Sequence, residues 1–303
     1  MKRLLVIARK FNDILYAFST EEWRRSDYRI LLILTQNIDC KSYPFQDRFD
    51  EVISVKVQSL SPKGQGQLIR DLSRHKDRIS CDYVLTSNVL LLSHRYVIRM
   101  SGCTSVGLLE DGLMNYRDDL TDKSVVKKAM QLLLGINLKK IYSLIHRTYL
   151  LKPDSARYYF GERLPIRLPK QLIDSLGIDL DLNGKSIFVG QNLYQYGYLS
   201  KEEYCDLVNR VIADYGIDYY LPHAFAESEH INCRYLNLAD FNVTLEMLAV
   251  SQNFTVYSFA SSVLFTSKLL NPEVRSIMVS AERIKGIGDF PIYRECGVEM
   301  ING

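Results

Sequence analysis

Two acidic residues, Glu110 and Asp111, stand directly after a short apolar run and directly before Gly112. Adjacent carboxylates suppress each other's ionisation, so one pKa rises and that group becomes a better general base toward a hydroxyl. A glycine in the third position allows the backbone to turn sharply behind the pair. Asp-Gly is also common in solvated turns, and for the motif alone this plainer interpretation stays open.

Groups that could bind a phosphate follow two later apolar runs. Pro222 and His223 come after one of them, where an imidazole could act as a general acid or, when protonated, pair with a phosphate. Ser261 and Ser262 follow another and precede a helical pattern, so we expect a hydroxyl to cap a helix whose N-terminus is also a phosphate site. A structural loop histidine and an ordinary helix cap are the competing interpretations.

The elements that must position these groups alternate between strands and helices. Helix-compatible segments separate apolar runs typical of buried strands, which predicts mostly parallel sheets with ligands at the carboxyl ends of the strands. We expect strands at 4–8, 28–35, 51–57, 83–86, 105–109, 187–189, 218–221, 255–258 and 276–280. We expect helices at 64–75, at 200–215 behind a Ser200/Glu203 capping box, at 242–250, at 260–269, and one or two within 123–152.

The length of 303 residues is enough for about two domains. The alternating pattern is interrupted where Pro153, Pro165 and Pro169 punctuate a stretch without periodicity. We therefore expect two Rossmann-like α/β domains joined by a linker. The expected boundaries are 1–155 for the first domain, 156–184 for the linker and 185–303 for the second domain.

Composition argues against several classes of protein. The net charge of +3 is too small to indicate nucleic-acid binding, and no run approaches the roughly 18 apolar residues of a membrane-spanning helix. Six cysteines without metal-type spacing predict reduced thiols, and the first residues are more typical of a strand than of a signal peptide, so we expect a cytoplasmic protein. Asp179 and Asp181 superficially resemble a metal-binding DxD pair, but we expect no metal there, since isolated carboxylates are usually solvated.

The segment 123–152 is strongly basic, with seven Lys or Arg and no acidic residue, and it also contains apolar residues such as Leu132 and Leu133. Such a surface could hold the protein against anionic lipid at the inner face of a membrane. The alternative is a solvated helix whose apolar face packs on its own domain.

In their order along the chain, these signals resemble the motifs of bacterial sialyltransferases: an acidic pair with a glycine, a His-Pro motif and a paired Ser/Thr motif. The stretches FVGQNLYQYGYLSKEEY at 188–204 and VYSFASSVL at 256–264 are similar to glycosyltransferase family 52. One departure is that His223 is followed by Ala224 rather than by proline. If the proline normally directs the imidazole, the acid role of this histidine is open.

The resemblance implies a GT-B fold, with two Rossmann-like domains facing across a cleft. The first would hold a glycan acceptor, either an oligosaccharide or a lipid-linked glycan, and the second would hold CMP-sialic acid. It implies an inverting transfer of sialic acid to a sugar hydroxyl, with a galactoside as the expected acceptor, on a bacterial capsule or lipooligosaccharide. No cofactor and no metal would be needed.

By the resemblance, Glu110 matches the catalytic base with Asp111 supporting it, although which of the two is the base stays open. His223 matches the histidine that assists departure of the CMP phosphate, and Ser261 and Ser262 match the phosphate-binding pair. Gly190, Gln191 and Pro222 are expected near the donor, and position alone suggests acceptor contacts at Arg9, Asn12, Gly112, Asn115 and Tyr116.

Three other functions remain open at this stage. One is a different GT-B glycosyltransferase that uses CMP-Kdo or a nucleotide-diphosphate sugar. The second is a non-catalytic sugar-binding protein of capsule assembly, and the third is a two-domain sugar-nucleotide epimerase. The acceptor sugar, the linkage and any homo-oligomer also stay open.

Overall fold

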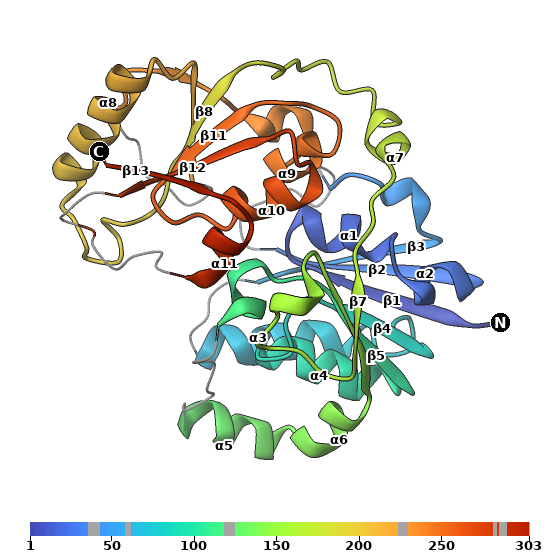
Figure 1. The fold of residues 1–303 in the computed structure, drawn as a ribbon. Coiled ribbons are helices and arrows are strands. Elements are labelled where there is room, and N and C mark those ends of the chain that lie inside the picture. Colours follow the sequence, from blue (N-terminus) through green and yellow to red (C-terminus); the bar gives the residue numbers. More distant parts are fainter. Residues whose placement is uncertain are drawn as a thin grey trace. The chain divides into compact units, whose positions relative to one another are not determined.

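The computed structural model describes residues 1–35, 43–57, 62–117, 125–223, 230–280, 284 and 290–302. The chain forms two compact units, Met1–Leu168 and Pro169–Gly303 (Figure 1). The division falls inside the segment 156–184, where the sequence predicts the linker.

The first unit is built on a seven-stranded sheet in the order β3-β2-β1-β4-β5-β6-β7, and all of its neighbouring strands are parallel. The order reverses direction beside β1, as in a Rossmann fold, where ligands bind at the carboxyl ends of the strands. The strands are β1 (Arg3–Ala8), β2 (Tyr28–Thr35), β3 (Glu51–Lys56), β4 (Tyr83–Thr86), β5 (Ser105–Leu108), β6 (Ile145–Leu150) and β7 (Glu162–Pro165).

Helices cover this sheet because alternate strand residues bury apolar side chains on its two faces. Leu5 and Ile7 of β1 belong to one core cluster with Leu72, Val97 and Ile141 of three different helices. The described helices of this unit are α1 (Phe11–Ala17), α2 (Glu21–Arg25), α3 (Pro62–Ser73), α4 (Leu92–Ser101), α5 (Val125–Leu133) and α6 (Leu138–Ser143).

The sequence-based expectation for 123–152 is right for α5 and α6 and wrong for 145–150, which form β6. Residues 123 and 124 lie outside the described part of the chain. The strand was missed because His146 and Arg147 break its apolar run, whereas Ile145 and Tyr149 are buried between β5 and β7. The expected linker also contains a strand, β7, which pairs with β6.

The second unit has a six-stranded parallel sheet in the order β10-β9-β8-β11-β12-β13. The predicted capping box is confirmed: the Ser200 hydroxyl accepts a hydrogen bond from the Glu203 amide, and the Glu203 carboxylate accepts one from the Ser200 amide. The strands are β8 (Ser186–Val189), β9 (Tyr219–Leu221), β10 (Arg234–Tyr235), β11 (Thr255–Ser258), β12 (Arg275–Ser280) and β13 (Glu299–Asn302). The described helices are α7 (Lys170–Asp174), α8 (Lys201–Tyr215), α9 (Leu245–Ala249), α10 (Val263–Leu270) and α11 (Pro291–Glu295).

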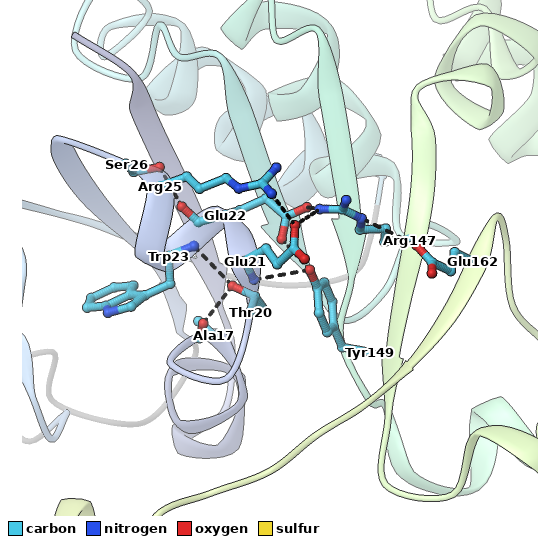
Figure 2. A network of polar contacts seen from close by, with 10 residues as sticks. All are labelled: Ala17, Thr20, Glu21, Glu22, Trp23, Arg25, Ser26, Arg147, Tyr149 and Glu162. Carbon is cyan, nitrogen blue, oxygen red and sulfur yellow. Dashed lines mark hydrogen bonds and ion pairs between the residues drawn. The ribbon is translucent and has the colours of Figure 1, made fainter.

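A polar network joins α2 to the far strands of the first sheet (Figure 2). The Tyr149 hydroxyl donates a hydrogen bond to Oε2 of the buried Glu22 at 2.6 Å. Arg147 Nη1 lies 2.8 Å from Glu21 Oε2 and 3.4 Å from Glu22 Oε1. Glu22 and Arg147 also line a cavity of about 310 Å³, with Tyr83, Ser105, Arg25 and His146. Since Tyr83 and Ser105 begin β4 and β5, this cavity lies at the amino ends of the strands.

We expect Tyr149→Phe to lower the free energy of unfolding by about 1–3 kcal/mol, because Glu22 would lose a buried hydrogen-bond donor. Burial and the neighbouring Glu22 raise the pKa of Tyr149, so its hydroxyl keeps the proton that it donates. Urea unfolding at neutral pH measures the effect. The matched control is Tyr159→Phe, at a side chain that is 40% exposed. Equal stability of the two variants would show that the network does not stabilise the fold.

Candidate active site

The carboxyl ends of three neighbouring strands of the first sheet bring Lys10, Asn88 and Asp111 together. They follow β1, β4 and β5, which are adjacent in the sheet. Lys10 Nζ lies 2.5 Å from Asp111 Oδ1, and Asn88 Nδ2 donates a hydrogen bond to Asp111 Oδ2 at 2.8 Å. The Asp111 side chain is 12% exposed and that of Lys10 is 48% exposed, so the pair reaches solvent at this edge. Lys10 and Asn88 were not predicted, although both closely follow predicted strands.

Glu110 is turned into the first unit. It is 1% exposed, and its Oε2 accepts hydrogen bonds from the Tyr116 hydroxyl at 2.8 Å and from the Leu151 amide at 2.9 Å. Its other oxygen, Oε1, is buried without a hydrogen-bond partner among the described residues. Burial raises the pKa of Glu110 to about 7, against the lowering effect of the two hydrogen bonds. Asp111 also raises this pKa, but its effect is the smallest of the identified causes. The adjacent carboxylate expected from the sequence is therefore a minor cause, and burial is the main one.

This burial makes stability depend on pH. The pKa of Glu110 is about 7 in the folded state and near its ordinary 4.5 when unfolded, so between these values the folded state binds more protons. The free energy of unfolding therefore falls as pH rises from about 4.5 to 7, by about 3 kcal/mol in all. Glu110→Gln keeps an oxygen acceptor but does not titrate.

We expect this decrease to be absent from Glu110→Gln, as measured by urea unfolding at about pH 4.5 and about pH 8. The matched control is Glu162→Gln. The Glu162 side chain is 62% exposed, so this variant should keep the decrease in the free energy of unfolding with rising pH. The same pH dependence in Glu110→Gln and in the unmodified protein would contradict the assignment of this titration to Glu110.

Asn115 and Tyr116, two of the expected acceptor contacts, hold the loop after β5 in place. Gly112 has a φ of 65°, so the sharp turn predicted for it is present. Asn115 is buried, accepts a hydrogen bond from the Asp111 amide at 2.6 Å and donates one to the Tyr158 carbonyl at 3.1 Å. Tyr116 is also buried, and its hydroxyl holds Glu110. Both side chains therefore fix the turn that carries Asp111.

The loop after β1 is held by Asp13. This buried carboxylate accepts hydrogen bonds from the amides of Arg9 at 2.8 Å and Lys10 at 3.0 Å. Burial raises the pKa of Asp13, and Lys10 opposes the rise. Arg9 and Asn12, the other expected acceptor contacts, flank Lys10 and are partly exposed. They lie on the edge of the sheet where Asp111 lies.

In the second unit, Gln191 links the loops that follow β8 and β11. Its side-chain Oε1 accepts a hydrogen bond from the Ala260 backbone amide at 2.9 Å. Its backbone amide donates one to the Tyr204 hydroxyl at 2.9 Å. The hydroxyls of Tyr204 and Tyr220 are 3.2 Å apart. A Cβ on Gly190 would lie 2.3 Å from the Tyr220 hydroxyl, so glycine is the residue that fits there. The two tyrosines were missed because they resemble ordinary core residues.

The two serines precede α10 in the same loop. Ser262 is the N-cap residue, but its side chain makes no capping hydrogen bond, so the predicted cap is wrong for this hydroxyl. The Ser261 hydroxyl accepts a long bond of 3.4 Å from the Val263 amide. Ser262 has helical backbone angles, which move it away from the usual extended cap geometry. Both side chains are partly exposed.

Pro222 and His223 follow β9, which is adjacent to β8. His223 is partly buried, and burial lowers its pKa, so the neutral imidazole predominates at pH 7. Ala224, where the sequence departs from the His-Pro motif, lies outside the described residues. Across the described ranges, no group of three or more His, Cys, Asp or Glu is placed to hold a metal ion. Asp181 Oδ1 accepts hydrogen bonds from the amide and the side chain of Asn183.

Comparison with known proteins agrees with this architecture. The family model "Glycosyltransferase family 52" matches residues 55–280. No curated protein sequence matches the chain. A UDP-GlcNAc 2-epimerase from Neisseria meningitidis bound to UDP-GlcNAc is similar, with 12% identity over 100% of this chain and 88% of that chain and a TM-score of 0.57.

Two glycosyltransferases are also similar in structure. Spinosyn forosaminyltransferase SpnP has 13% identity over 92% of this chain and 80% of its own, with a TM-score of 0.52. Spinosyn rhamnosyltransferase SpnG complexed with thymidine diphosphate has 10% identity over 100% of this chain and 86% of its own, with a TM-score of 0.52. At these identities the likeness concerns the fold, and it confirms the expected GT-B type with two Rossmann-like domains.

The family match spans more than half of the chain and includes Glu110, Asp111, His223, Ser261 and Ser262. Family and fold together support glycosyl transfer, with a nucleotide-sugar donor and a glycan acceptor. The chain belongs to glycosyltransferase family 52.

Proposed function

We propose that this glycosyltransferase moves sialic acid from CMP-sialic acid to a hydroxyl of a galactoside on a bacterial surface glycan, with inversion and without a metal or cofactor. The observation that carries the proposal is the position of Asp111 at the carboxyl edge of the first sheet. Lys10 and Asn88 hold its carboxylate there, within reach of solvent.

Asp111, rather than Glu110, is the base in this proposal. A general base must lie within hydrogen-bond reach of the proton that it removes. Glu110 is 1% exposed and uses Oε2 for Tyr116 and Leu151, so an acceptor sugar cannot reach it without unfolding the loop. Asp111 is adjacent to solvent, and its carboxylate forms an ion pair with Lys10 at 2.5 Å. Glu110 then acts as a positioning residue that anchors the turn.

The second unit supplies the groups for the leaving phosphate. Departure of CMP gives an oxocarbenium-like sugar and places negative charge on the phosphate, as in other glycosyl transfers. The N-terminus of α10 and the hydroxyls of Ser261 and Ser262 can donate hydrogen bonds to that charge. His223 can donate an N–H to the phosphate even when its imidazole is neutral. Attack by the acceptor oxygen opposite the leaving phosphate inverts the anomeric carbon.

The test is incubation of the purified protein with CMP-sialic acid and a panel of galactosides, with products identified by mass spectrometry and NMR. The proposal predicts a sialylated galactoside with inverted anomeric configuration, formed equally well in EDTA. Thermal shifts should be larger with CMP than with UDP. Transfer only from CMP-Kdo or from a nucleotide-diphosphate sugar would replace the donor assignment. Release of an epimerised sugar without any acceptor, or no consumption of any donor, would overturn transfer itself.

A further inference from the structure

An apolar and basic surface on α5 and α6 is not used by the proposed chemistry. Leu132 and Leu133 are adjacent at the end of α5, and they are 81% and 87% exposed. Leucine is usually buried in a folded domain, and contiguous exposed apolar surface is a feature of interaction sites. Figure 1 shows α5 and α6 at the outer edge of the first unit, below α4 in this view.

α5 packs on its unit through the face opposite the two leucines, so the orientation of its exposed face is fixed. Met130 and Leu134, one helical turn apart, pack against the core cluster of the first unit, and Gln131 between them is buried. Residues 128 and 132 share a different face by the same spacing, which places Lys128 and Leu132 side by side on the exposed surface. The two leucines therefore cannot turn inward without unpacking α5.

The exposed surface of α5 and α6 also carries positive charge. Lys128, Lys139 and Lys140 are exposed and form no ion pair with any residue in the described part of the chain. The exposed Arg99 adds a fourth cation. Its guanidinium lies beside Gly135, in the turn between α5 and α6, since a Cβ built on this glycine would lie 3.2 Å from Arg99 Nη2. The stretch 123–153 contains no acidic residue. A soluble protein partner with an ordinary mixed surface would not need this uniform charge.

We propose that Leu132 and Leu133, with Lys128, Lys139 and Lys140, form a docking surface for an anionic lipid bilayer. The leucines enter the boundary between headgroups and acyl chains, and the lysines remain at the level of the lipid phosphates. The surface is independent of the donor and of Asp111, so it holds whether or not the proposed transfer is correct. Among the described residues, no helix is long and apolar enough to cross a membrane.

The test is co-sedimentation of the full chain with vesicles of phosphatidylcholine alone and of phosphatidylcholine containing about one-third phosphatidylglycerol. Binding should require phosphatidylglycerol and decrease with added salt. The triple change Lys128→Gln, Lys139→Gln and Lys140→Gln should lower the partition coefficient on the order of 100-fold. The double change Leu132→Ser and Leu133→Ser should lower it on the order of 10-fold. These side chains are exposed, so thermal unfolding should be unchanged.

Two matched controls separate the docking surface from general charge. Changing the same three lysines to arginine keeps the charge and should keep binding. Changing the exposed Lys76, Lys170 and Lys185 to glutamine removes three charges elsewhere and should leave most of the binding. An equal loss of vesicle binding in the two variants with three Lys→Gln changes would overturn the proposal. So would vesicle-free dimerisation that is abolished by Leu132→Ser with Leu133→Ser, because the surface would then join two copies of the chain.

Discussion

Replacing Asp111 by asparagine should lower the turnover number for CMP-sialic acid about 10²–10⁴-fold, which is the usual contribution of a positioned general base. The amide has nearly the shape of the carboxylate, and it can still accept a hydrogen bond from Lys10, but it cannot take up the acceptor proton. Because the donor does not need this carboxylate for binding, its KM should change little. Initial rates with saturating galactoside measure the effect.

Two variants serve as controls for this experiment. Asp240→Asn changes an exposed aspartate in the second unit and should leave turnover unchanged. Glu110→Gln keeps the buried hydrogen-bond acceptor and should retain a large part of the activity at neutral pH. If Glu110→Gln instead abolished turnover while folded, and Asp111→Asn remained active, the base would be Glu110 and the assignment made from burial would be wrong.

Removing both hydroxyls at Ser261 and Ser262 should lower turnover on the order of 10²–10³-fold, the range for lost donors to a developing negative charge. The effect should appear mainly in kcat, because the charge on the phosphate grows as the glycosidic bond to CMP breaks. Ser262 makes no capping hydrogen bond, and the bond that the Ser261 hydroxyl accepts is long, at 3.4 Å, so the double alanine variant should keep most of its stability. Steady-state kinetics with CMP-sialic acid and thermal unfolding measure the two quantities.

Ser251→Ala is the matched control, since this serine lies in the same unit, after α9, and away from the loop before α10. An increase in KM alone for the double variant would show that the serines bind the donor equally in its ground state and transition state. Turnover equal to that of the control would remove the phosphate role from this loop.

Much of the fold is predictable from the sequence because its central strands are short apolar runs between polar segments. β2, β4 and β11 have the expected bounds, and the other predicted strands differ by one residue at an end. The two missed strands of the first sheet, β6 and β7, contain charged residues. Arg147 of β6 contacts residues that are distant in the sequence. Arg147 is paired with Glu21 and Glu22, which lie more than a hundred residues earlier in the chain, so local periodicity could not indicate a strand there.

The candidate site was predictable in its residue types and not in their roles. Neighbouring residues of one motif have opposite environments: Asp111 reaches solvent, and Glu110 is enclosed by Tyr116 and the Leu151 amide. That difference depends on β6 lying beside β5, which the sequence analysis did not foresee. Gly190 shows the same limit, because the glycine is required by Tyr220, whose hydroxyl comes from another strand.

The bond from the Ala260 amide to Gln191 Oε1 has a consequence for the redesign of donor specificity. A main-chain N–H makes this bond, so many side chains could replace alanine at position 260 without breaking it. Proline is the exception, since it has no N–H to donate. Consider a chimera in which the segment 259–262 comes from another glycosyltransferase. This loop should keep its position beside β8 only when Gln191 is retained and the residue at position 260 is not proline.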